Sequence, residues 1–248
     1  SLGSMFKACS NISGTIPATF TLKENTNLNY IGHLFEGCNR LSGSIPRGLD
    51  FSTLTKLQST YAMFSGCRSL TGSIPPTMTF ANNPELTDIG GTFLGCSGLS
   101  GGIPSGMTFA KNSKLEYAGS VFKGCSNLTG SIPSEMTFAS NPKLKSLASL
   151  FSGCSQLTGK IPEGMTFANN PDLELANAIF YNCVQLGIDP QSGESRYGIP
   201  SGMTLDDKPN LTSTDSMFRL CSSLTGAIPD RLLSFRGCSN LVATKDMF

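Results

Sequence analysis

Apolar and polar positions follow one pattern along this chain, and the pattern recurs with a constant period of 29. Phenylalanine, cysteine and leucine stand three residues apart, and Ile-Pro, Met-Thr-Phe and Asn-Pro-x-Leu segments follow in that order. The period is marked by seven evenly spaced cysteines: Cys9, Cys38, Cys67, Cys96, Cys125, Cys154 and Cys183. A single repeat of this length cannot bury its own apolar side chains, so successive repeats must stack against each other.

Within each repeat, the first predicted element is a short helix. Asn before Pro, as in Asn170-Pro171, is typical of a helix start, because Asn caps the helix and Pro loses no hydrogen bond at its first position. Steps of three and four residues, which indicate one helical face, separate Leu173, Ala176, Ile179, Phe180 and Cys183. Gly95, Gly124 and Gly153 precede cysteines and suit a tight exit from that helix.

The remainder of each repeat predicts extended structure. The Leu-Thr-Gly-x-Ile segment is short and ends at proline, and Met-Thr-Phe alternates between apolar and polar side chains. Stacked turns would pair these strands in parallel, about 4.8 Å apart. We therefore expect one α/β solenoid domain over residues 1–248, a leucine-rich-repeat array of about eight 29-residue turns with short parallel strands and short helices.

The motif Phe-x-x-Cys-x-x-Leu-Thr-x-x-Ile-Pro resembles the leucine-rich repeats of BspA-type bacterial surface proteins. Met63 to Leu70 and Met217 to Leu224 are also similar to a repeat of bacterial surface lipoproteins. The period of 29 is longer than is usual there. Leu-Thr-Gly-x-Ile-Pro also resembles plant-type repeats, but the Leu-x-Leu-x-x-Asn strand of those repeats is missing. The BspA-type resemblance implies a secreted or surface-anchored recognition module without enzymatic activity.

The repeat is interrupted twice, first between Cys183 and Cys221, whose separation exceeds one period. The additional residues lie at 187–198, where an exposed loop is expected, and such loops often bind partners. Its polar and aromatic residues are the candidate ligand-binding residues: Asp189, Glu194, Arg196 and Tyr197. The alternative is a tolerated surface insertion with no role, because lengthening a loop costs little free energy.

The second interruption lies between Cys221 and Cys238, whose separation is much shorter than one period. It predicts a shortened terminal repeat over residues 222–248 that lacks the Met-Thr-Phe and Asn-Pro-x-Leu segments. A shortened unit is common where a repeat array approaches a cap.

The cysteines predict a structural ladder rather than a reactive site. The ladder comprises Cys38, Cys67, Cys96, Cys125, Cys154 and Cys183. No Cys-x-x-Cys motif occurs, so no metal site is expected. Equivalent cysteines in stacked turns would hold their Cβ atoms near 5 Å apart, whereas a disulfide needs about 3.8 Å. We therefore expect buried, reduced thiols that act as small apolar side chains.

Candidate catalytic residues are sparse, and no cofactor is expected. His33 is the only histidine, and it occupies a repeat position held elsewhere by Ala62 and Gly91. No phosphate-binding glycine loop or His-Glu-x-x-His motif occurs. An enzyme would need a pair of carboxylates meeting in a cleft, which spacing alone leaves open, but Asp and Glu form no repeated column.

The composition of the chain argues against nucleic acid and membrane as partners and disfavours glycans. The chain carries 18 basic against 17 acidic residues, so no nucleic-acid footprint is expected. Its apolar runs, such as Ala178 to Tyr181, are far shorter than the roughly 18 residues of a membrane span. Ladders of Ser and Thr could bind glycans, but aromatic residues are only 8% and Trp is absent, which disfavours sugar stacking.

These observations lead to one expected function and one alternative. We expect a monomeric, non-catalytic recognition or adhesion module that binds a host or matrix protein through the solenoid face and the 187–198 loop. The alternative is a carbohydrate-binding surface protein. We expect the protein at a bacterial cell surface or outside the cell, anchored by a segment absent from this chain.

Overall fold

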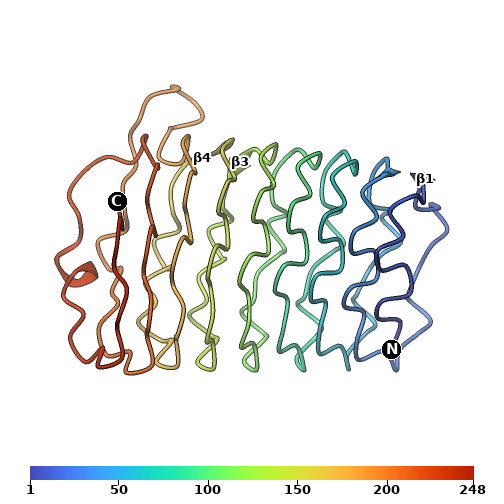
Figure 1. The fold of residues 1–248 in the computed structure, drawn as a ribbon, viewed down its shortest axis with the longest axis horizontal. Coiled ribbons are helices and arrows are strands. Elements are labelled where there is room, and N and C mark those ends of the chain that lie inside the picture. The colour runs from blue at the N-terminus through green and yellow to red at the C-terminus, as the bar shows by residue number, and fades with distance from the viewer.

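The computed structural model describes all residues 1–248 as a stack of similar turns that lie side by side along one long axis (Figure 1). The two termini lie towards opposite ends of the stack. A continuous core of 59 buried residues runs through it, from Ile16 to Met247. The fold is therefore the expected solenoid. No helix in the structure has the length and apolar character needed to cross a bilayer.

Parallel pairing between turns forms the regular structure. β1 (Gly14–Thr15) pairs with β2 (Leu41–Ser42), and β3 (Gly130–Ser131) pairs with β4 (Leu157–Thr158). These strands confirm the extended Leu-Thr-Gly segment. A second ladder of single parallel bridges joins one residue per turn: Tyr30, Ser59, Asp88, Tyr117, Ser146, Leu175, Ser213 and Ala243.

The helix expected in each repeat is absent, and that prediction was wrong. Alternate N–H groups of the segment donate instead to the next turn: Ala176 to Ser213, Ala178 to Asp215, and Phe180 to Met217, at 2.8–3.0 Å. Ala178 has a left-handed φ of 54°, which an α-helix excludes. The only helix is a 3-10 turn, η1, at Asp230–Leu232.

The expected apolar face is nevertheless real. Leu173, Ala176, Ile179, Phe180 and Cys183 are all fully buried. A chain that turns back every few residues also brings every third or fourth side chain inwards, so the apolar spacing does not distinguish it from a helix.

Phenylalanine and cysteine fill the centre of each turn. Nine rings form one stack with centroids 5.4–5.9 Å apart: Phe6, Phe35, Phe64, Phe93, Phe122, Phe151, Phe180, Phe218 and Phe248. All six cysteines from Cys38 to Cys183 in the expected ladder are buried and carry free thiols. Each thiol donates to a phenylalanine carbonyl of the preceding turn, as Cys67 Sγ does to Phe35 O at 3.0 Å.

The Asn of the Asn-Pro segments serves a different purpose from the expected helix cap. Four side chains of this column are fully buried: Asn83, Asn112, Asn141 and Asn170. Asn83 Nδ2 donates to the carbonyls of Phe51 and Leu54 in the preceding turn, at 3.0 and 2.8 Å. The Asn side chain is therefore a second donor to two buried carbonyls, which also accept from Leu54 N and Leu57 N.

The terminal repeat at 222–248 is not shortened in the way expected. Ser213 pairs with Ala243, and Phe218 stacks on Phe248, so both partners lie one full turn further along the chain. Cys238 consequently stands one turn beyond Lys208, in the column of the buried Asn side chains, and its thiol donates to Leu205 O at 2.9 Å. Phe235 and Cys238 have the three-residue spacing of the repeated Phe-x-x-Cys motif, but they lie at a different position of the turn.

Replacing Asn83 by Ala tests the asparagine ladder. Asn83→Ala should lower the free energy of unfolding by about 1–3 kcal/mol, because it removes two buried hydrogen bonds between adjacent turns. Asn82→Ala is the matched control, since Asn82 is exposed and makes one 3.3 Å bond, and its effect should stay within about 0.5 kcal/mol. Urea unfolding measures both, and equal effects would contradict the ladder's role.

Alkaline pH tests the burial of the thiols. Burial raises the pKa of Cys67 and Cys125 to about 12, and it also raises the pKa of Cys96 well above its usual value. Above about pH 8.5, which is the pKa of an unfolded thiol, the cysteines of the unfolded chain lose their protons while the buried thiols of the folded chain keep theirs. The free energy of unfolding therefore falls as pH rises, by about 1.4 kcal/mol per pH unit for each buried thiol.

Urea unfolding between about pH 9 and about pH 11 measures that slope. Cys96→Ala should reduce this slope by about 1.4 kcal/mol per pH unit, whereas the neighbouring control Ser97→Ala removes no thiol and should leave the slope unchanged. Identical slopes in the two variants would contradict the burial of the ladder.

Candidate functional site

The insertion at 187–198 folds into a small hairpin that projects beyond the row of turns, shown in orange in Figure 1. Ile188 and Ser195 form an antiparallel bridge. Across the tip, Asp189 N donates to Glu194 O, and Gly193 N donates to Asp189 O, both at 2.8 Å. The insertion is therefore an ordered element with its own hydrogen bonds.

Of the four candidate residues in this loop, Asp189 is only 6% exposed. Its carboxylate accepts hydrogen bonds from Gln191 N at 3.0 Å and from Arg196 Nη1 at 3.2 Å. The Gln191 amide and the Arg196 guanidinium lower the pKa of Asp189 below its usual value. Asp189 therefore holds the hairpin together, while Glu194 and Arg196 remain on its exposed outer side.

Tyr197 stands where the hairpin rejoins the solenoid. Its N–H donates to Gly187 O at 2.9 Å, and its carbonyl accepts from Thr225 N at 3.1 Å. A side chain on Gly187 would place its Cβ 2.4 Å from Ser223 O, and Gly187 has a φ of 108°, so only glycine fits. The backbone of Tyr197 is thus fixed between two turns.

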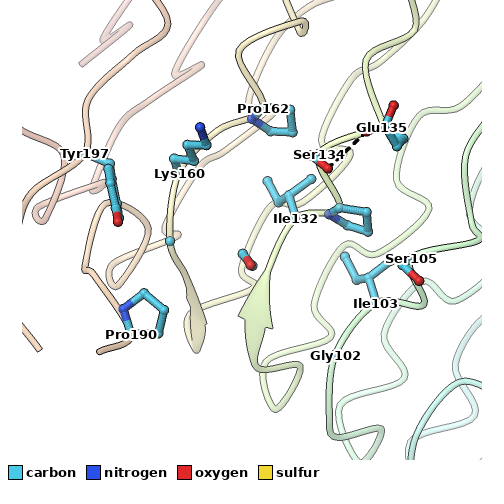
Figure 2. Close-up of a pocket in the computed structure, with 13 residues that line it drawn as sticks. Gly102, Ile103, Ser105, Ile132, Ser134, Glu135, Lys160, Pro162, Pro190 and Tyr197 are labelled. Atoms are coloured by element: carbon cyan, nitrogen blue, oxygen red, sulfur yellow. Dashed lines mark hydrogen bonds between the residues drawn. The ribbon is translucent and has the colours of Figure 1, made fainter. Parts of the chain in front are cut away.

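Tyr197 and Pro190 form one wall of a groove of about 630 Å³ that continues over three neighbouring turns (Figure 2). Half-buried Pro133 and exposed Pro190 supply apolar surface there, beside Ile103 and Ile132, which are buried. The polar lining comes from Ser105, Ser131, Ser134, Glu135 and Lys160. Of the four predicted residues, the structure brings only Tyr197 into this groove.

Lys160 and Glu135 give the groove its charge, and the repeat comparison could have found both. Lys160 occupies a column held by Ser44, Ser73, Gly102 and Ser131 in earlier turns. Glu135 occupies a column held by Gly48, Thr77, Gly106 and Gly164. A single charged residue in a column of small residues is not required by stacking, so both residues are candidates for a role other than packing.

The two charges lie on different sides of the apolar surface. Figure 2 shows Lys160 on the side of Tyr197, and Glu135 beyond Ile132, hydrogen-bonded to Ser134. Lys160 Nζ lies 3.9 Å from Glu163 Oε1, with both side chains exposed, so this ion pair is weak and leaves the ammonium able to contact a ligand. No group of three His, Cys, Asp or Glu side chains in the structure could hold a metal ion.

Comparison with known proteins yields no sequence relative: no protein-family model and no curated protein matches the chain. Solved structures similar to it include the plant peptide hormone receptor RGFR1 in complex with RGF2, with a TM-score of 0.43 and 20% identity over 94% of this chain and 34% of the receptor chain. The chain therefore spans about a third of that receptor's length.

A second similar structure is the functional domain of InlJ from Listeria monocytogenes, described as including a cysteine ladder. It has a TM-score of 0.34 and 18% identity, over 90% of this chain and 47% of that one. A plant ice-binding protein has a TM-score of 0.34 and 21% identity, over 71% and 53%. Since all three TM-scores are below 0.5, we take neither family nor function from them.

Proposed function

We propose that this protein is a non-catalytic recognition module that binds an extended peptide segment of a partner protein in the groove beneath the 187–198 hairpin. The observation that carries the proposal is the wall formed by Tyr197 and Pro190 in the same groove as Pro133 and Lys160. An insertion that departs from the repeat and builds one side of a groove is the arrangement by which solenoids acquire binding sites.

The chemistry of the groove favours a peptide with an apolar and an acidic group. Pro133 and Pro190 offer apolar surface to aliphatic or proline side chains, and Tyr197 offers a ring with a hydroxyl group that can form a hydrogen bond. Lys160 favours a carboxylate at one side, and Glu135 disfavours one at the other, so the charges would set the direction of the bound segment.

The cellular setting follows from the BspA-type resemblance of the repeat. We propose a bacterial surface or secreted protein, anchored through a segment outside this chain, that acts as a monomer on a host or matrix protein. A glycan ligand is the weaker alternative, because Tyr197 is the only aromatic ring in the groove and sugar binding usually relies on stacking.

Substitution of Lys160 tests the groove. Peptides that bind the immobilised chain are first selected from a displayed random library. The affinity of each selected peptide for the chain and its variants is then measured by surface plasmon resonance. Lys160→Ser restores the residue of earlier turns and should weaken groove-binding peptides about tenfold, since it removes an ion pair or charged hydrogen bond of roughly 1.4 kcal/mol. Lys123→Ser is the matched control, because Ser65 and Ser152 occupy its column, and it should change nothing.

Deletion of residues 188–197 provides the second arm. Loss of peptide binding with an unchanged melting temperature supports the proposal. Binding that survives both the deletion and Lys160→Ser would contradict it. A glycan array screened in parallel separates the alternative: saturable glycan binding that Tyr197→Ala abolishes, without any selected peptide, would overturn the peptide proposal.

A further inference from the structure

A second groove, of about 440 Å³, lies over the turns that follow Tyr30 and uses none of the residues of the first. Its two large side chains are Tyr61 and Tyr117, which are 43% and 41% exposed. The repeat equivalents of Tyr61 are small in the neighbouring turns, at Gly32, Gly90, Gly119 and Ala148, and polar in later turns, at Asn177 and Asp215. Tyr61 is thus the one aromatic residue of its column, at a surface position where stacking does not require it.

Asp88 lies in this groove and is the only carboxylate in its ladder column, which runs from Tyr30 to Ala243. Its Oδ1 accepts one hydrogen bond, from Gly90 N at 2.8 Å. A Cβ on Gly90 would lie 3.1 Å from Asp88 Oδ1 and 3.3 Å from Tyr61 Cδ2. Gly90 therefore lies close against both the carboxylate and the edge of the Tyr61 ring, with no room for a side chain of its own.

Asp88 has no lysine or arginine partner within the protein, although nearby His33 acts to lower its pKa. The other carboxylate in the groove, Glu36, pairs with Lys7 at 2.9 Å. Asp88 belongs to none of the nine ion pairs of the structure. Burial raises the pKa of Asp88 because it removes water from the carboxylate. A cation placed beside it would recover the lost solvation.

The tyrosine rings add a second attraction for a cation. Lys145 Nζ already lies 5.7 Å from the centroid of Tyr117, while it pairs with Glu116 at 2.7 Å. Tyr61 has no lysine or arginine over its ring, and its one ring neighbour, His33, meets it edge-on at 5.0 Å. Tyr61 can therefore take a cationic group against its ring.

We propose that this groove binds the side chain of an arginine in an extended peptide, with Asp88 as its counter-ion and Tyr61 as its aromatic wall. Arginine fits better than lysine because its planar guanidinium can pair with a carboxylate in two places and also stack on a ring. This proposal concerns different residues from those of the Tyr197 groove, so either can fail alone.

The test uses the full 248-residue chain with isotope-labelled tyrosine rings, observed by NMR. The probe is the peptide acetyl-Gly-Gly-Arg-Gly-Gly-amide, and its control contains citrulline, which has the shape of arginine without the charge. The arginine peptide should shift the Tyr61 ring signals in a saturable way, and the citrulline peptide should bind at least about tenfold more weakly.

Asp88→Asn should weaken binding of the arginine peptide by a similar factor. Asp172→Asn is the matched control, because Asp172 is exposed, lies outside the groove and forms no ion pair, and it should leave binding unchanged. Gly90→Ala places a methyl group that must displace the Asp88 carboxylate and the Tyr61 ring, and it should also abolish the shifts, with the melting temperature checked in each variant.

Equal binding of the citrulline peptide, or unchanged binding by folded Asp88→Asn, would overturn the proposal. So would the absence of any saturable shift in the wild-type chain. A neutral oligosaccharide that shifts Tyr61, while the arginine peptide does not, would make the groove a glycan site instead.

Discussion

The hydrogen bond from the backbone of one turn to that of the next is the constraint on which this structure depends. In each turn, alternate N–H groups donate forward, as those of Ala62, Phe64 and Gly66 do to carbonyls of the following turn. Because these bonds fix the position of each turn against its neighbour, every side-chain column must stay in alignment. The constant interval between the cysteines in the sequence results from this need for alignment.

Side chains that repeat along the stack are those that can occupy the same buried position in every turn. Phenylalanine stacks ring on ring, cysteine is small enough to repeat at full burial, and asparagine donates to two carbonyls of the preceding turn. At the surface, where a side chain need not pack against the next turn, the residue type in a column varies from turn to turn. There, Lys160, Tyr61 and Asp88 interrupt their columns without disturbing the stack, and the two proposed binding grooves lie at these positions.

The sequence predicted the solenoid and its inward-facing residues, but it could not predict the conformation of each segment. Leu173 to Cys183 has helical spacing, yet its N–H groups bond to the next turn, and only the stacked arrangement decides between these partners. Cys238 shows a similar ambiguity. Its sequence neighbours match the repeated cysteine motif, but the bridge between Ser213 and Ala243 aligns the last turn so that Cys238 lies in a different column. At the candidate site, Tyr197 was named from sequence, whereas Lys160 required comparison of the columns.

Solution NMR gives the most direct test of the turn-to-turn hydrogen bonds. Scalar couplings across hydrogen bonds should connect the amide nitrogens of Ala62 and Phe64 to the carbonyl carbons of Gly90 and Thr92, which lie in the next turn. Helical couplings and amide contacts within residues 60–67, with no coupling to residues 88–94, would contradict the account.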